Sequence, residues 1–132
     1  MFKKWRLNSL RCSSKILTSS ALVKNDFYLN LVDWSNSNFL IVGLATSVYL
    51  WNANNSKVTK LCDLGIYNQV SSVSSSPKDC LAALGTNNGE VQIWDLVKVK
   101  KTNVLTGHSL RVGTIAWNSN ILSTGSRDQM IL

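Results

Sequence analysis

One histidine, one threonine and one aspartate near the end of the chain carry the groups that acyl transfer would need. His108 is the only histidine, and Thr124 and Asp128 follow it. A hydroxyl, an imidazole and a carboxylate can serve as nucleophile, general base and the group that orients that base. Such catalysis also needs an exposed, strained hydroxyl and an oxyanion site, and the sequence indicates neither around Thr124. We therefore expect no enzymatic activity, and acyl transfer at Thr124 with His108 is the catalytic alternative.

Two aspartates frame an aromatic stretch earlier in the chain. Asp26 and Asp33 lie on either side of Phe27 and Tyr28. Carboxylates beside an aromatic ring offer charge and stacking to an arginine or lysine of a bound peptide. Capping and turn stabilisation explain the same aspartates equally well. From the residues alone, both interpretations remain open.

The cysteines and the N-terminal sequence indicate a compartment rather than a cofactor. Cys12, Cys62 and Cys80 form neither a zinc pattern nor an evident disulfide framework. With no paired carboxylates and no glycine-rich phosphate loop, we expect no metal and no cofactor. Free thiols are typical of a reducing compartment, so we expect the nucleus and cytoplasm. The first 20 residues lack the apolar segment of a secretory signal, and a mitochondrial presequence is the alternative that their basic, serine-rich composition leaves open.

The positive charge is concentrated at the N-terminus. The net charge is +7, and residues 1–25 carry six bases and no acid, whereas the rest is nearly neutral. We expect a basic, flexible N-terminal arm, with phosphate or acidic-protein contact as the alternative. No stacking platform with interleaved arginines follows the arm, so nucleic acid is an unlikely partner. No apolar run approaches the ~20 residues that span a bilayer, which predicts no membrane association.

Tryptophans and glycines recur at an interval of about forty residues. Trp51 and Trp94 are 43 residues apart, and Gly43, Gly85 and Gly125 follow one another at 42 and 40 residues. Trp34 and Trp117 are separated by two such periods, and the position between them falls near Ser75, where the tryptophan is lost. A period of this length indicates an array of similar structural units.

Each unit reads as short strands separated by turn residues. Ser76-Pro77-Lys78-Asp79 and Asn87-Asn88-Gly89 are strong turn sequences, and Asn-Gly supplies the positive φ of tight hairpins. The predicted strands are Leu29–Trp34, Phe39–Gly43, Val48–Asn52, Lys57–Cys62, Val70–Ser75, Cys80–Gly85, Glu90–Trp94, Lys100–Leu105, Val112–Trp117, Ile121–Gly125 and Gln129–Leu132.

Several of these strands are apolar without alternation, as in residues 40–42 and 81–84. A sheet covered on both faces has no solvent side, so its strands lose alternation. The blades of a β-propeller stack in this way, whereas an ordinary antiparallel sandwich gives no reason for the period. We therefore predict an all-β fold, a partial WD-repeat β-propeller of about two and a half four-stranded antiparallel blades. The arm is residues 1–25 and the incomplete propeller 26–132, with blades at 26–66 and 67–107 and a partial blade at 108–132.

The repeat gives His108, Thr124 and Asp128 a structural interpretation. In a WD unit these positions form a buried hydrogen-bond relay, in which the imidazole donates to the turn aspartate and accepts from the strand hydroxyl. Buried polar groups need partners, so the relay fastens one strand to the next. The register places the tryptophan that completes it near position 134, beyond Leu132, so we expect an incomplete relay. Trp51 and Trp94 are expected to pack in the core or between blades.

Several longer motifs are far more specific than the repeat. They are Asp26-Phe27-Tyr28-Leu29-Asn30-Leu31-Val32-Asp33-Trp34-Ser35, Val48-Tyr49-Leu50-Trp51-Asn52-Ala53, Leu61-Cys62-Asp63-Leu64, Gly89-Glu90-Val91-Gln92-Ile93-Trp94-Asp95, Gly107-His108-Ser109-Leu110-Arg111-Val112-Gly113 and residues 123–132. Together they resemble the first blades of the Fizzy and Fizzy-related activators of the anaphase-promoting ubiquitin ligase. The Fizzy-related branch is the nearer of the two.

The resemblance implies a substrate-recruiting role. Members of this family hold degron peptides, the D-box and the KEN box, against the ligase with a seven-bladed propeller. The Asp26 position resembles the acid that meets the D-box arginine, and the Asp33 position resembles part of the surface used by KEN peptides. Asp26, Tyr28 and Asp33 are therefore the predicted degron-binding residues, and the ligase and degron-bearing cell-cycle proteins are the predicted partners.

The sequence also departs from the family pattern. No Asp-Arg-Tyr-Ile-Pro C-box stretch precedes Asp26, and no Ile-Arg tail is present. Ser75 replaces a blade tryptophan, and Gln129 lies where a basic residue is expected. An array of 2.5 blades exposes blade faces and a sheet edge, so self-association through open edges is a further expectation. A truncated WD scaffold without independent ligase-activating function is the alternative.

Overall fold

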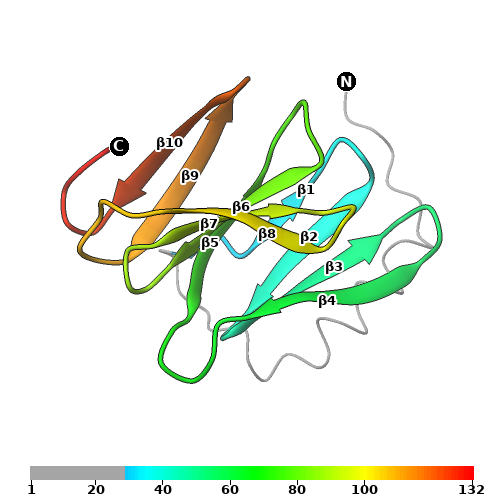
Figure 1. Ribbon diagram of the computed structural model, residues 1–132, viewed down its shortest axis with the longest axis horizontal. Coiled ribbons are helices and arrows are strands. Elements are labelled where there is room, and N and C mark those ends of the chain that lie inside the picture. The colour runs from blue at the N-terminus through cyan, green and yellow to red at the C-terminus, as the bar shows by residue number, and fades with distance from the viewer. Residues whose placement is uncertain (1–28) are drawn as a thin grey trace.

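The computed structural model describes residues 29–132, which form β-strands joined by turns and loops (Figure 1). The strands are β1 (Val32–Trp34), β2 (Phe39–Leu44), β3 (Ser47–Asn52), β4 (Lys57–Asp63), β5 (Val70–Ser75), β6 (Leu81–Thr86), β7 (Val91–Asp95), β8 (Lys100–Leu105), β9 (Val112–Asn118) and β10 (Ile121–Ser126).

Three antiparallel sheets follow one another along the chain. Their orders are β1-β2-β3-β4, β5-β6-β7-β8 and β9-β10, so every neighbour in a sheet is also a neighbour in sequence. Figure 1 shows the β5–β8 sheet between the β1–β4 sheet and the β9–β10 hairpin. This arrangement confirms the predicted all-β, partial WD-repeat propeller. Below, the three units are called the first sheet, the second sheet and the hairpin.

The second strand of each full sheet is buried on both faces, as its apolar run predicts. Ile41 of β2 belongs to the core between the first and second sheets, whereas its neighbours Leu40 and Val42 belong to a separate core on the opposite face. In β6, Ala82 packs in the core shared with the first sheet, and Ala83 packs in the core shared with the hairpin. Because both faces are covered, these strands have no polar side to alternate with.

The repeating tryptophans occupy equivalent positions, as the period requires. Trp51 lies opposite Leu40, and Trp94 lies opposite Ala82, the corresponding residue of the second sheet. Both indoles lie on the face of their sheet that points toward the preceding repeat: Trp51 in the core beyond the first sheet and Trp94 against the core between the sheets.

Two glycines are required by close contacts between repeats. At Gly85, a Cβ atom would collide with the Ser72 hydroxyl and would lie 2.9 Å from the carbonyl oxygen of Val112 in the hairpin. Gly89 has a φ of +87°, and a Cβ there would collide with the carbonyl of His108. The Asn88-Gly89 turn of the second sheet therefore lies directly against the loop that begins the next repeat.

Two predicted strand boundaries are wrong at the ends of the described chain. The first regular strand begins at Val32 rather than Leu29, because Asn30 forms a parallel bridge with Ser72 of the neighbouring sheet. Residues 129–132 form a single bridge, Gly125 with Ile131, rather than the predicted strand. The amide of Leu132 nevertheless donates to the Thr124 carbonyl at 2.9 Å, so this segment follows β10 closely.

Candidate functional site

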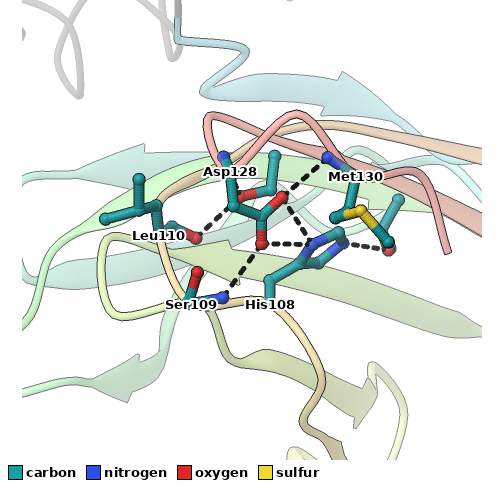
Figure 2. Close-up of polar contacts among 7 residues, drawn as sticks. His108, Ser109, Leu110, Asp128 and Met130 are labelled. Carbon is teal, nitrogen blue, oxygen red and sulfur yellow. Dashed lines mark hydrogen bonds and ion pairs between the residues drawn. The ribbon is translucent and has the colours of Figure 1, made fainter.

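The polar groups near the end of the chain converge at one point of the hairpin. His108 comes from the loop between β8 and β9, Thr124 from β10, and Asp128 from the turn after β10. His108 Nδ1 lies 3.0 Å from Asp128 Oδ2, and His108 Nε2 lies 2.9 Å from Thr124 Oγ1 (Figure 2). The side chains of His108 and Asp128 are only 2% and 8% exposed. The structure thus brings together the three residues that the sequence assigned to a relay.

The Asp128 carboxylate is held in its charged form. Burial acts to raise its pKa, but the backbone amides of Met130 and Ser109 and the side chain of His108 donate to it and lower the pKa to about 2. Both amides lie 2.9 Å from the carboxylate oxygens. An ionised carboxylate only accepts hydrogen bonds, so His108 Nδ1 carries the proton between them. In the neutral imidazole, Nε2 then accepts the proton of the Thr124 hydroxyl.

This geometry is better suited to holding the strands and loops of the hairpin together than to nucleophilic attack by Thr124. Thr124 is 6% exposed and lies within the regular strand β10, where an acyl substrate has no access to its hydroxyl. Its hydroxyl is also already bonded to the imidazole. The relay instead ties the loop before β9 to the turn after β10, and two bonds beside it do the same: Ser126 Oγ donates to the Leu110 carbonyl, and the Arg127 amide donates to the Arg111 carbonyl.

The predicted degron-binding residues are described only in part. Asp26 and Tyr28 lie outside the described residues. Asp33 lies in β1, and its carboxylate accepts hydrogen bonds from the amide of Ser75 and, at 2.7 Å, from the Ser75 hydroxyl. Its other oxygen accepts from the Trp34 amide at 2.9 Å. The carboxylate thus joins β1 to β5, and a basic group of a bound peptide would share it with Ser75.

Sequence reasoning missed the residue that engages Asp33. Ser75 was noted only as the position of a lost tryptophan, yet its two donors meet the carboxylate 42 residues before it. One repeat further on, the indole Nε1 of Trp117 donates to the carbonyl of Ser74 at 3.2 Å. The signal in the sequence was the repeat itself, because residues one period apart lie on adjacent inner strands.

The other residues that the structure describes offer few groups suited to binding a metal or carrying out a reaction. No group of three histidine, cysteine, aspartate or glutamate side chains among residues 29–132 is placed to hold a metal ion. Within the same range, no helix has the length and apolar character to cross a membrane. Cys62 is buried in the core between the sheets, and this burial raises the pKa of its thiol to about 11.

Comparisons with known proteins identify relatives by sequence. No protein-family model matches the chain. The chain is 54% identical over 123 residues to Protein FIZZY-RELATED 1 of Arabidopsis thaliana, covering 93% of this chain and 26% of that protein. It is 50% identical over 119 residues to the anaphase-promoting complex subunit cdh1 of Dictyostelium discoideum, covering 89% of this chain and 16% of that protein. The chain therefore spans about a quarter or less of the length of these relatives.

Comparison of structures leads to the same group. A protein chain in the crystal structure of the mitotic checkpoint complex matches with a TM-score of 0.82 at 38% identity, covering 85% of this chain and 35% of that chain. Sequence and fold thus agree over the same stretch. The resemblance to the Fizzy/Fizzy-related family is confirmed, and the chain carries a Fizzy-related sequence on a partial WD-repeat propeller.

Proposed function

We propose that this chain acts as a substrate-recruiting activator subunit of the anaphase-promoting ubiquitin ligase, or as a fragment of one, and binds degron peptides of cell-cycle proteins. The supporting observation is the match to Fizzy-related proteins, which runs through the inner strand that carries Asp33. The name of the Dictyostelium relative supports the ligase as the partner. The same proposal places the chain in the nucleus and cytoplasm, which a fluorescent fusion would report.

The described part of the chain is suited to binding rather than to catalysis. The relay of His108 is buried, whereas Asp33 is half-buried and lines an open pocket at the ends of the inner strands. In this proposal, Asp26 and Tyr28 meet the arginine of a D-box, and Asp33 contributes to the KEN-peptide surface. A carboxylate that already accepts two bonds from Ser75 and one from the Trp34 amide can still accept a fourth, because its oxygens offer about four acceptor sites.

A D-box peptide tests the proposal directly. Fluorescence anisotropy with a labelled D-box peptide should show saturable binding to the whole chain, and Asp26→Ala should weaken it by about tenfold, the loss of one charge-assisted contact of roughly 1.4 kcal/mol. Asp79→Ala is the matched control, since Asp79 is exposed in the turn between β5 and β6 and is not one of the predicted contact residues.

A second candidate function has its own support. Ser75 engages the carboxylate of Asp33 with both of its donors. This observation favours the alternative, a truncated WD-repeat scaffold without independent ligase-activating function. A wild-type chain that ignores the D-box peptide, or an Asp79→Ala effect equal to that of Asp26→Ala, would decide for this alternative.

A further inference from the structure

Three residues occupy the same place in the three repeats, and one of them is small. Trp34 lies opposite Leu40, Ser75 opposite Ala82, and Trp117 opposite Leu122, at matching positions of the first strand pair of each unit. The first and third positions hold an indole. The second sheet therefore has a serine where its neighbours on both sides have a large aromatic side chain.

A pocket lies at this position. Its volume is about 300 Å³, and it is open to solvent. The lining comes from all three units: Asp33, Trp34 and Asn36 of the first sheet, Ser74, Ser75, Ser76 and Pro77 of the second sheet, and Trp117 of the hairpin. The pocket thus lies between the two indoles that flank Ser75 in the repeat.

Hydrogen bonds between the sheets fix the rim of this pocket. Asn36 Nδ2 donates to the Pro77 carbonyl at 2.9 Å, which joins the turn after β1 to the turn after β5. Beside it, the Ser37 hydroxyl lies 3.3 Å from Cys80 Sγ. On the far side, Trp117 is held by its bond to the Ser74 carbonyl. The walls are therefore tied to one another.

We propose that this pocket binds the indole side chain of a tryptophan presented by a partner polypeptide. The repeat supplies the shape, because an indole fills the equivalent place on either side. Trp117 lines the pocket as a further aromatic residue, whereas the Trp34 indole packs edge-to-face on Trp51 in the core beyond the first sheet. Asp33 supplies an acceptor for the indole N–H, as the Ser74 carbonyl does for Trp117. The pocket shares Asp33 with the proposed degron surface, but this inference concerns an indole, whereas degron binding concerns basic groups of a peptide.

The probe is fluorine-labelled N-acetyltryptophanamide, titrated into the whole chain and followed by fluorine NMR. Wild type should shift or broaden the probe signal saturably. Ser75→Trp places a covalent indole in the pocket, so probe binding should weaken by at least about tenfold. The same variant should melt no lower than Ser75→Ala, which loses the same hydroxyl bond to Asp33, because its indole enters a space that the repeat already accommodates. Ser123→Trp adds a tryptophan at an exposed position of β10, outside the pocket, and should bind the probe as wild type does.

Each remaining outcome overturns the proposal. If wild type leaves the probe signal unchanged, the pocket takes no indole. If Ser75→Trp still binds the probe, the probe lies elsewhere. A lower melting temperature for Ser75→Trp than for Ser75→Ala would show that an indole does not fit at this position. Equal loss of binding in Ser123→Trp would show that the effect does not belong to this pocket.

Discussion

The junction between the first and second sheets is built differently from the hairpin that follows. Ten buried residues form the core between the sheets, including Ile41, Val73 and Leu84, which are fully buried. The core between the second sheet and the hairpin has five, and large apolar side chains of the hairpin such as Ile121 (67%) remain exposed. The first junction thus has the larger apolar core, whereas the hairpin is held together internally by the polar bonds of the relay.

The same difference is visible at equivalent positions. In the hairpin, the Thr124 hydroxyl belongs to the relay, whereas the equivalent positions of the two sheets hold the apolar residues Val42 and Leu84. The indole Nε1 of Trp51, two residues after the partner of Val42, is buried with no hydrogen-bond partner. Ser71 and Ser72, by contrast, both donate to the Val112 carbonyl of the hairpin, at 2.6 and 2.8 Å. The repeats thus have the same backbone arrangement but are stabilised by different side-chain interactions.

The largest expected effect comes from the apolar junction. Ile41→Ala leaves a cavity in a core with no exposed surface, and we expect it to lower the free energy of unfolding by about 2–5 kcal/mol. Urea unfolding of the whole chain measures this loss. Val104→Ala, at an exposed position of β8, is the control and should change the stability by less than about 0.5 kcal/mol. Equal losses in the two variants would show that the loss of stability is not specific to the apolar junction.

A smaller and more local effect is expected from the relay. His108→Ala leaves the Thr124 hydroxyl and the Asp128 carboxylate short of a partner, which costs about 1–3 kcal/mol. Hydrogen exchange should accelerate at the amides of β9 and β10 and stay unchanged in β2 and β6. Lys100→Ala changes an exposed side chain of β8 and should leave both patterns as they are. Uniform acceleration across all sheets would mean that the relay stabilises the whole array rather than the hairpin.

The smallest expected effect is a pH dependence confined to the hairpin. The pKa of Asp128 is lowered from 3.8 to about 2, so its ionised form stabilises the fold above pH 3.8, and this stabilisation is lost as the pH falls toward 2. Exchange protection of β10 amides should fall over that window in wild type. In Asp128→Asn the step should disappear. The pKa of Asp63 is lowered as well, chiefly by its hydrogen bond with the Lys60 ammonium, but Asp63 lies in the first sheet. A step that persists in Asp128→Asn would therefore assign the pH dependence to a carboxylate other than Asp128.

Much of the architecture was predictable because it depends on local signals. Turn residues and apolar runs placed the strands from β2 to β10 to within about a residue, and β5 and β8 match their predicted ranges. The spacing of Trp51 and Trp94 predicted that they would lie at equivalent places. The relay was predictable because the repeat alone assigns His108, Thr124 and Asp128 to equivalent positions of a WD unit.

Contacts across repeats were not predictable in the same way. The repeat places Asp33 and Ser75 on adjacent inner strands, but whether the Asp33 carboxylate faces solvent or Ser75 depends on how closely β1 lies against β5, and strand patterns carry no information on that. The parallel bridge between Asn30 and Ser72 has the same origin. Predicting the pocket beside Ser75 requires two facts. The loss of a large side chain is visible in the sequence, whereas the placement of the neighbouring side chains is not. The predicted roles of Asp26 and Tyr28 remain predictions.

The contact between Gly89 and His108 has a consequence for sequence change in this fold. The turn of the second sheet and the histidine loop share one space, so a methyl group at position 89 would displace the His108 backbone. The imidazole is positioned by that backbone, and its two bonds to Asp128 and Thr124 would be misaligned together. A replacement in one repeat would thus disturb the hydrogen bonds of the next, and because the collision is with backbone atoms, no change of the side chain at position 108 would relieve it.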